Sequence, residues 1–286
     1  MNIVVFHLYY TENQISLTMQ LQQLIDRHWV DYTRQNPSVQ KIYNLLTSQG
    51  EKVRHDHIAF RTFSDPRVNI DVLEKPFLDA GYREMGTYTF TRKHAFAKHY
   101  ELPGDEENLR VFISQLQTEE LSPFIRQTMA GLVNEIPGES LEPEKLMFLG
   151  TPWGPLSYET YQKLRDESEY AAWMYAFGFR VNHFAISING LGKYDTPEKV
   201  NDLLKGRGYI MNQSGGEIKG SREQLLEQSS IMADHNQVAF REGTHGIPAC
   251  YYEFTKRYRD EKNRLFNGFI TQSADKIFES TNYYEK

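Results

Sequence analysis

A short stretch of the sequence combines a histidine and an arginine in a strand-like pattern. Residues 54–63 read Arg-His-Asp-His-Ile-Ala-Phe-Arg-Thr-Phe, and side chains in a strand alternate between its two faces. We therefore expect His57, Ala59 and Arg61 on one face, where the small alanine leaves room for an anion or a metal ion. A lone strand histidine is more often a hydrogen-bonded structural residue than a ligand, so this stretch needs a second signal.

The second signal is an internal repeat of the same pattern. Residues 180–189 read Arg-Val-Asn-His-Phe-Ala-Ile-Ser-Ile-Asn, so His183 follows His57 by 126 residues (183 minus 57). A Gly-Tyr pair provides another landmark, because Gly81-Tyr82 and Gly208-Tyr209 are 127 residues apart (208 minus 81). Two landmarks that agree within one residue indicate a duplicated unit.

Each copy of the repeat is predicted to be a β-α-β-β-β unit. The first begins with the His57 strand, followed by a helix at 71–80 and strands at 82–91, 95–102 and 110–116. The second begins with the His183 strand, followed by a helix from Thr196-Pro197, strands near 209–212, 237–241 and 248–256, and an inserted helical turn at 221–229. Two such units side by side would curl a mixed sheet around a cavity, with the two histidines facing each other.

The predicted fold class is therefore α+β, with paired βαβββ units and added helices, in one compact domain. Helices are expected over most of 12–50, from Ser122-Pro123 onward and at 157–177, with a loop at 136–154. The predicted organisation is an N-terminal helical segment, a first unit, a helical insert, a second unit and a C-terminal tail, at 1–52, 53–116, 117–179, 180–258 and 259–286.

A third ligand could come from the last strand of the second unit. Residues 251–255 read Tyr-Tyr-Glu-Phe-Thr, and a carboxylate among such residues is costly to bury unless it is paired or binds a metal. If Glu253 faces inward, it forms a two-histidine, one-carboxylate set with His57 and His183. That set leaves coordination positions open and suits non-haem Fe(II). Outward exposure of Glu253, or an ion pair with a basic residue that follows it, stays open on spacing alone.

Several short motifs together carry a resemblance to a known family. They are Asp56-His57-Ile58-Ala59-Phe60-Arg61-Thr62, Val111-Phe112-Ile113-Ser114, Asn182-His183, Ser229-Ser230 with Met232-Ala233-Asp234, and Tyr252-Glu253-Phe254. Over most of residues 20–282 the chain resembles the DUF1338 family, associated with 2-oxoadipate dioxygenase/decarboxylase within the vicinal oxygen chelate superfamily. The resemblance implies paired βαβββ units, His57, His183 and Glu253 as Fe(II) ligands, and Arg61 as the arginine for a substrate carboxylate. The chain is shorter than the best-characterised bacterial members, which leaves the substrate open.

The implied reaction is the oxidative decarboxylation of a 2-oxo acid such as 2-oxoadipate by O₂. It gives CO₂ and a 2-hydroxy acid that is one carbon shorter. His57 and Arg61 lie about 13 Å apart along a strand, which suits a short dicarboxylate held at both ends. One alternative is a Zn²⁺ or Ni²⁺ isomerase, lyase or hydrolase of the same fold, and another is a metal-free protein that binds a small anion.

Three further residues have roles that the sequence leaves open. His245 lies in Gly-Thr-His-Gly, which is typical of a hairpin turn and is expected near the cavity mouth. Ser230 could line the cavity or bond to the backbone. Arg241 is expected on a central strand of the second unit, as a second anion clamp or as an ion-pair partner of a glutamate.

Composition limits the function classes. The chain has 286 residues, 40% hydrophobic and 24% charged, with no apolar run of the roughly 20 residues that span a bilayer. The net charge of −6, without a Lys/Arg block, argues against nucleic acid as a partner. The single cysteine, Cys250, excludes an intrachain disulfide and favours a cytoplasmic location. We read Met1–Tyr10 as an ordinary N-terminal segment. The sequence decides neither between Met1 and Met19 as the start nor between a monomer and a homodimer.

Overall fold

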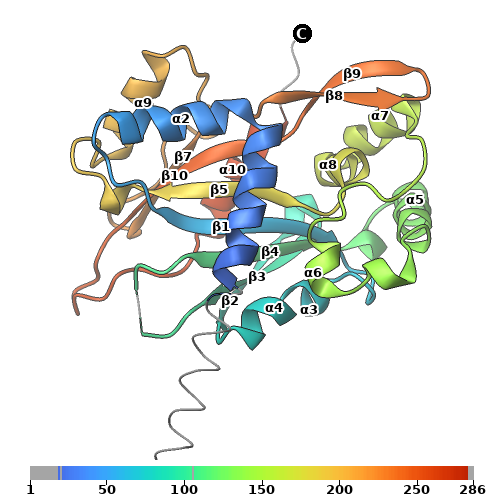
Figure 1. The fold of residues 1–286 in the computed structure, drawn as a ribbon, viewed down its shortest axis with the longest axis horizontal. Coiled ribbons are helices and arrows are strands. Elements are labelled where there is room, and N and C mark those ends of the chain that lie inside the picture. Colours follow the sequence, from blue (N-terminus) through green and yellow to red (C-terminus); the bar gives the residue numbers. More distant parts are fainter. Residues whose placement is uncertain (1–18, 20, 105, 283–286) are drawn as a thin grey trace, which may run out of the picture.

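The structure, a computed structural model, describes residues 19, 21–104 and 106–282 of the chain. Its centre is an eight-stranded mixed sheet with the strand order β2-β3-β4-β1-β5-β10-β7-β6 (Figure 1). The expectation about Met1–Tyr10 falls outside the described residues.

The two middle strands show that the sheet consists of two related halves. β1 (His55–Phe63) pairs antiparallel with β5 (Val181–Ser187), with Ile58 opposite Phe184. His57 lies opposite Ala185 and Ala59 opposite His183 in the same ladder. Positions that differ by 126 residues are therefore exchanged across the pair, as a pseudo-twofold axis requires. The predicted pairing of two units is confirmed.

Each half continues outward from its middle strand in the same way. In the first half, β1 is followed by α3 (Ile70–Leu73), α4 (Lys75–Asp79), β2 (Arg83–Phe90), β3 (Ala95–Glu101) and β4 (Arg110–Leu116). In the second half, β5 is followed by α9 (Pro197–Lys205), β6 (Lys219–Ser221), β7 (Leu226–Ser230) and β10 (Tyr251–Arg257). The chain leaves α4 and α9 through Gly81 and Gly208, both of which have positive φ, so the two Gly-Tyr landmarks mark equivalent turns.

Three of the secondary-structure predictions for the second unit were wrong, two for strands and one for a helical turn. A hairpin of β8 (His235–Phe240) and β9 (Gly243–Pro248) forms a separate two-stranded sheet, so the predicted strand at 237–241 lies outside the main sheet. The predicted strand at 209–212 contains only one bridge, from Met211 to Ile231. The predicted helical turn at 221–229 is the β6–β7 hairpin. The polar sequence of β7 obscured it, because its buried Gln228 and Ser230 are bonded to other polar side chains.

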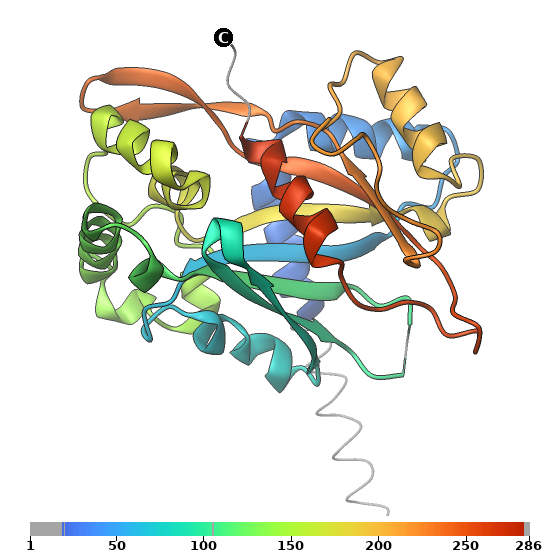
Figure 2. The ribbon, with the colours of Figure 1, turned by 180° about the vertical axis from the view of Figure 1, so that it is seen from behind.

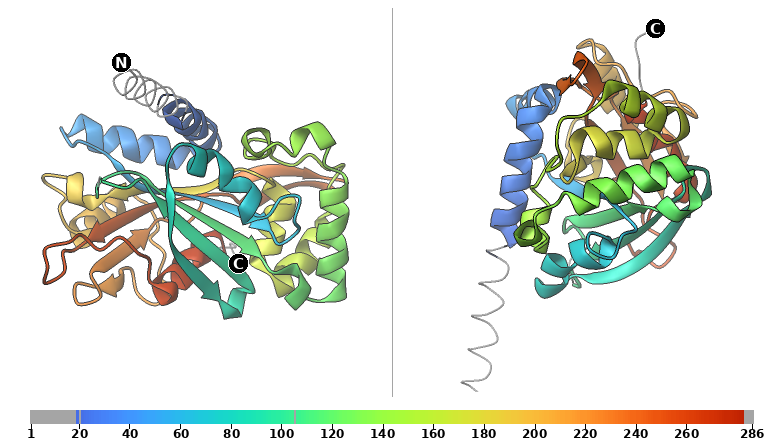
Figure 3. Two further views of the ribbon diagram at one scale, coloured as in Figure 1. Left: turned by 90° about the horizontal axis from the view of Figure 1, so that it is seen from below. Right: turned by 90° about the vertical axis from the view of Figure 1, so that its right-hand side faces the viewer.

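Helices cover both faces of the sheet. The helix at 21–35 and α2 (Pro37–Ser48) lie on one face, and α10 (Thr271–Ile277) crosses the other (Figures 1, 2 and 3). Four more helices gather at one end of the sheet: α5 (Pro123–Asn134), α6 (Pro143–Leu146), α7 (Tyr158–Glu167) and α8 (Glu169–Phe177). The predicted helix at 157–177 is two helices, because Ser168 caps α8 by accepting a hydrogen bond from the Ala171 amide.

Short 3₁₀ turns join several of these elements: η1 (Thr91–Lys93), η2 (Thr118–Glu120), η3 (Gly138–Ser140), η4 (Ile188–Gly190) and η5 (Phe278–Thr281). Gly178 ends α8 with a φ of 64°, where a Cβ would lie 1.8 Å from the Gly150 carbonyl oxygen. Only glycine fits that turn, which leads directly into the His183 strand. Within the described residues, no helix is both long enough and apolar enough to cross a membrane.

Candidate metal centre

The two repeat histidines and Glu253 meet on the face of the sheet that α10 crosses. The Nε2 atoms of His57 and His183 are 3.3 Å apart, and Glu253 Oε2 lies 3.6 Å and 3.3 Å from them. All three residues are buried, with 1–3% of their surface exposed. Ligand atoms bound at about 2.1 Å to one ion lie roughly 3.0–3.6 Å apart. The three residues could therefore hold one metal ion.

The hydrogen bonds of the histidines fit a cation at this point. His57 Nδ1 bonds to Asp56 Oδ1 at 2.8 Å, and His183 Nδ1 bonds to Asn182 Oδ1 at 2.9 Å. Since each Nδ1–H donates to an oxygen, each neutral ring presents a bare Nε2 lone pair. Two such lone pairs and a carboxylate oxygen face one another, and a metal ion would satisfy all three.

Two polar side chains hold the other oxygen of Glu253. Gln228 Nε2 donates to Oε1 at 2.6 Å, and Thr255 Oγ1 donates to it at 2.9 Å. Burial raises the pKa of Glu253, but the neighbouring His57 and His183 outweigh it and lower the pKa well below its usual range. Glu253 is therefore ionised and oriented, with Oε2 directed at the histidines.

The residues behind the two histidines differ in charge. Asp56 forms a bidentate ion pair with Arg257 at 2.7 Å and 2.9 Å, and both side chains are buried. Asn182 is neutral, and its Nδ2 finds no partner in the part of the chain that the structure describes. Burial lowers the pKa of both histidines. Glu253 and Asp56 overcome this for His57 and raise its pKa, whereas the pKa of His183 falls to about 4.

A β-bulge separates the metal-site histidine from its neighbour. His55 and His57 are two residues apart and would share a face in a regular strand, but the ladder with β5 shifts register between them. His55 instead packs against Trp29 on the face that the helix at 21–35 covers, and its Nε2 bonds to the Tyr252 hydroxyl at 2.8 Å. His55 is therefore not a ligand of this site.

The register of β4 and β10, the strands on either side of the middle pair, explains why the site has three protein ligands. Glu253 pairs with Ala185 in the second half, and Phe112 pairs with Ala59 at the equivalent position in the first half. Phe112 also lines the small cavity at the site. The pseudo-twofold symmetry thus places an apolar ring where a fourth ligand would stand, which leaves part of an ion's coordination sphere open.

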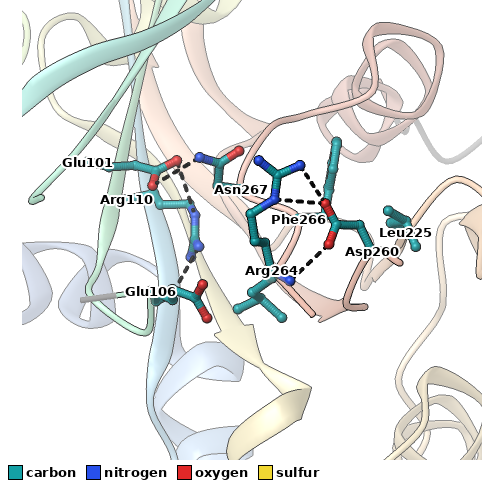
Figure 4. Close-up of a pocket in the computed structure, with 9 residues that line it drawn as sticks. Glu101, Glu106, Arg110, Leu225, Asp260, Arg264, Phe266 and Asn267 are labelled. Atoms are coloured by element: carbon teal, nitrogen blue, oxygen red, sulfur yellow. Dashed lines mark hydrogen bonds and ion pairs between the residues drawn. The ribbon is translucent and has the colours of Figure 1, made fainter. Parts of the chain in front are cut away.

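The C-terminal segment closes the site. The cavity beside the ligands measures only about 10 Å³, and Phe269, Ala274, Ile277 and Phe278 cover it. A larger hollow of about 340 Å³ lies beyond Arg110 and contains none of the three ligands (Figure 4). Its charged residues largely pair with one another, as Arg264 does with Asp260 at 2.7 Å. A substrate bound in the larger hollow would therefore not contact the three metal-site ligands.

Arg61 lies four residues after His57 on β1 and is also buried. Its Nη1 donates to Glu169 Oε1 at 3.1 Å, and its Nη2 donates to Thr281 Oγ1 at 3.3 Å. Arg61 does not line the small cavity, but Phe278 does, and that ring lies 5.5 Å from the guanidinium carbon.

The structure corrects the expectations for His245 and Arg241. His245 lies in β9, not in the hairpin turn, and its ring stacks on Tyr158 at 3.5 Å rather than lying at the cavity mouth. Arg241 lies in the turn between β8 and β9, where it is exposed, and not on a central strand. Both errors come from the hairpin insertion, which removes this segment from the main sheet. Ser230 is buried and bonds to Ser280 Oγ at 2.8 Å, so it does not line the cavity.

Sequence reasoning missed several residues around the site. Gln228, Glu169 and the C-terminal residues Phe269 and Thr281 contact the ligands or Arg61 from distant parts of the chain. The polar run Gln228-Ser229-Ser230 beside a strand was the one available signal, since polar residues are rare in a buried strand.

Comparison with known proteins decides the family. A family model described as 2-oxoadipate dioxygenase/decarboxylase matches residues 6–137 and 147–262. The chain belongs to the 2-oxoadipate dioxygenase/decarboxylase family. Its relatives include the chloroplastic 2-oxoadipate dioxygenase/decarboxylase of Arabidopsis thaliana, 33% identical over 276 residues, or 87% of this chain and 74% of the relative. The chloroplastic/amyloplastic enzyme of Oryza sativa is 33% identical over 278 residues, or 87% and 75%.

Solved structures agree with this family and fold. The hydroxyglutarate synthase of Oryza sativa in complex with 2-oxoadipate superimposes with a TM-score of 0.85, at 30% identity and 93% coverage of both chains. A protein from Shewanella frigidimarina described as a hydrolase gives a TM-score of 0.82 at 43% identity, covering 87% of this chain and 97% of that one. A glyoxalase superfamily protein from Ralstonia eutropha, at 19% identity, 86% and 84% coverage and a TM-score of 0.69, shares the fold. As a member of the 2-oxoadipate dioxygenase/decarboxylase family, the chain is an enzyme.

Proposed function

We propose that this chain acts on 2-oxoadipate with Fe(II) held by His57, His183 and Glu253. One 2-oxoadipate and one O₂ give one 2-hydroxyglutarate and one CO₂. One carbon–carbon bond breaks and both atoms of O₂ enter the products, so no additional reductant or 2-oxoglutarate co-substrate is required. The observation that carries the proposal is the convergence of these three buried ligands in a member of this family.

The donor set supports iron as the metal. Two imidazoles and one carboxylate suit non-haem Fe(II), and the group found among the described residues contains no thiol. Fe(II), when bound, supplies a centre for O₂ and for the 2-oxo acid end of the substrate. The neighbouring side chains fix the ligand atoms: Asp56 and Asn182 orient the imidazoles, and Gln228 with Thr255 orients the carboxylate.

Arg61 is proposed to bind the far carboxylate of the substrate. It lies four residues after His57 on β1, about 13 Å along an extended strand, and its long side chain can shorten that span. Its planar guanidinium can donate two parallel hydrogen bonds to a carboxylate. The aromatic rings of Phe112 and Phe269 line the small cavity beside the ligands and give it an apolar wall, which suits contact with a methylene chain.

Oxygen uptake with a panel of 2-oxo acids tests the proposal. The protein is loaded with Fe(II) without oxygen, mixed with each acid, and then exposed to O₂ in an oxygen electrode, with the product identified by mass spectrometry. We expect uptake with 2-oxoadipate, release of 2-hydroxyglutarate, and no uptake by Glu253→Ala. No uptake with any acid would contradict the proposal.

A second candidate is a metal-dependent hydrolase, because the Shewanella frigidimarina structure that is 43% identical is described as a hydrolase. The same three ligands could hold Zn²⁺, which would polarise a carbonyl group and a water molecule. Tightly held zinc, with no oxygen uptake and with hydrolysis of a test ester or amide, would favour this candidate over the dioxygenase.

A further inference from the structure

The guanidinium of Arg61 has one edge that is incompletely bonded. Its Nη1 donates to Glu169 at 3.1 Å, and its Nη2 forms a long hydrogen bond of 3.3 Å to Thr281. The Nε–H has no partner among the described residues, although the side chain is only 1% exposed. A buried donor without a partner is unfavourable, because it has lost its hydrogen bonds to water. The Nε–Nη2 edge, which presents two parallel donors, is therefore the side of Arg61 that lacks its full complement of acceptors.

Aromatic rings keep that edge in position. The guanidinium carbon lies 4.8 Å from the centre of the Tyr170 ring, 5.0 Å from Trp173 and 5.5 Å from Phe278. Glu169, the first residue of α8, holds the opposite nitrogen and balances the charge. The guanidinium is thus fixed on several sides, and an acceptor must approach it at the Nε–Nη2 edge.

Thr281 occupies part of this edge and belongs to the segment that closes the metal centre. Its hydroxyl donates to Glu169 Oε1 at 2.6 Å while it accepts from Arg61 Nη2. The same segment, α10 and η5, crosses this face of the sheet (Figure 2). It contributes Ala274, Ile277 and Phe278 to the lining of the cavity. A cavity of about 10 Å³ has room for about one water at most, so its walls, to which this segment contributes, must move apart before a 2-oxo acid can enter.

We propose that Thr281 holds the place of the substrate's far carboxylate on Arg61, and that Glu169 is a positioning residue for that arginine. A dicarboxylic 2-oxo acid replaces the Thr281 hydroxyl with two carboxylate oxygens, on Nε and Nη2, and thereby releases η5 and α10 from the site. A monocarboxylic 2-oxo acid has no group that can replace Thr281. This inference rests on the proposed function and adds to it the residues that select a dicarboxylate.

Binding measurements on two neighbouring variants test the proposal. Dissociation constants of 2-oxoadipate and 2-oxohexanoate, which lacks the second carboxylate, are measured by calorimetry on the Fe(II)-loaded protein without oxygen. Thr281→Val removes the competing hydroxyl and is expected to raise the preference for 2-oxoadipate about threefold to tenfold. Ser280→Ala is the matched control, because Ser280 bonds to Ser230 and Asn212 and not to Arg61. We expect it to leave the preference unchanged.

Hydrogen exchange provides a readout that does not depend on the variants. We expect saturating 2-oxoadipate to increase amide exchange at 271–281, and 2-oxohexanoate to leave it unchanged. An unchanged preference in Thr281→Val, an equal change in Ser280→Ala, or full protection of 271–281 with 2-oxoadipate bound would overturn the proposal. So would failure of 2-oxoadipate to bind. Binding with these effects but without oxygen uptake would instead contradict only the proposed function.

Discussion

Both halves of the sheet present a histidine at the same position, yet only the first half carries an arginine four residues later and only the second carries a carboxylate that faces the histidines. His57 and His183 are exchanged by the pseudo-twofold axis. Four residues after them stand Arg61 and Ser187, and the last strands carry Phe112 and Glu253 at equivalent positions. The duplication thus supplies a symmetric scaffold, and the differences between the halves make the site itself asymmetric.

The comparison extends to the residues behind the histidines. Asp56 is charged and bound by Arg257, which also donates to the carbonyl groups of Phe266 and Gly268 just before Phe269. Asn182 has no charge and no such connection. The first half therefore links its histidine to the C-terminal segment that covers the site, whereas the second half does not.

The largest expected effect comes from removing either repeat histidine. His57→Ala and His183→Ala should each lower metal affinity by more than the roughly 10- to 100-fold loss that follows removal of a group that only supports a ligand. Metal content after dialysis, measured by elemental analysis, checks this. A variant that keeps its full complement of metal would show that its histidine is not a ligand.

Exchanging the residues behind the histidines tests whether the halves are interchangeable. Asp56→Asn should weaken metal binding about 10- to 100-fold and should lower the free energy of unfolding by about 3 kcal/mol, because Arg257 stays buried without its partner. Metal titration and urea unfolding measure the two effects. The double variant Asp56→Asn with Asn182→Asp should not restore either value, since Arg257 pairs with the residue at position 56 and not with the one at position 182. Full restoration would contradict the asymmetry.

Making the two last strands alike tests the open coordination positions. Phe112→Glu adds a carboxylate at the position equivalent to Glu253, where it would compete with the substrate. We expect the metal to be retained and oxygen uptake to fall by roughly tenfold or more. Phe112→Leu, which keeps the position apolar, is the control. Equal activity of the two variants would show that this position does not limit access.

The smallest of these effects is expected at the arginine. Arg61→Lys keeps the charge but cannot donate two parallel hydrogen bonds, so turnover of 2-oxoadipate should fall about tenfold while metal content stays unchanged. A monocarboxylic 2-oxo acid should be affected less. Loss of metal in parallel with turnover would contradict a role for Arg61 in substrate binding.

The duplication made the framework predictable. Two histidines in matching patterns indicated paired units. A glutamate within an apolar strand raised the possibility of an inward carboxylate, because burial of an unpaired charge is unfavourable, but spacing alone left outward exposure open. The separation of the β8–β9 hairpin from the main sheet was missed, because an inserted strand has the same local pattern as a strand of the main sheet. The bulge at Asp56 and the contacts of Glu169 and Thr281 with Arg61 depend on packing between segments more than 100 residues apart, which local patterns do not encode.

The most direct test of the account measures metal and gas exchange on one sample. Protein loaded with Fe(II) is freed of excess metal, its iron per chain is determined, and O₂ uptake and CO₂ release are followed with 2-oxoadipate. The account predicts one iron per chain and one O₂ consumed for each CO₂ released, with both lost in Glu253→Ala. A chain that holds zinc tightly and consumes no oxygen, or a Glu253→Ala variant that keeps both iron and turnover, would contradict it.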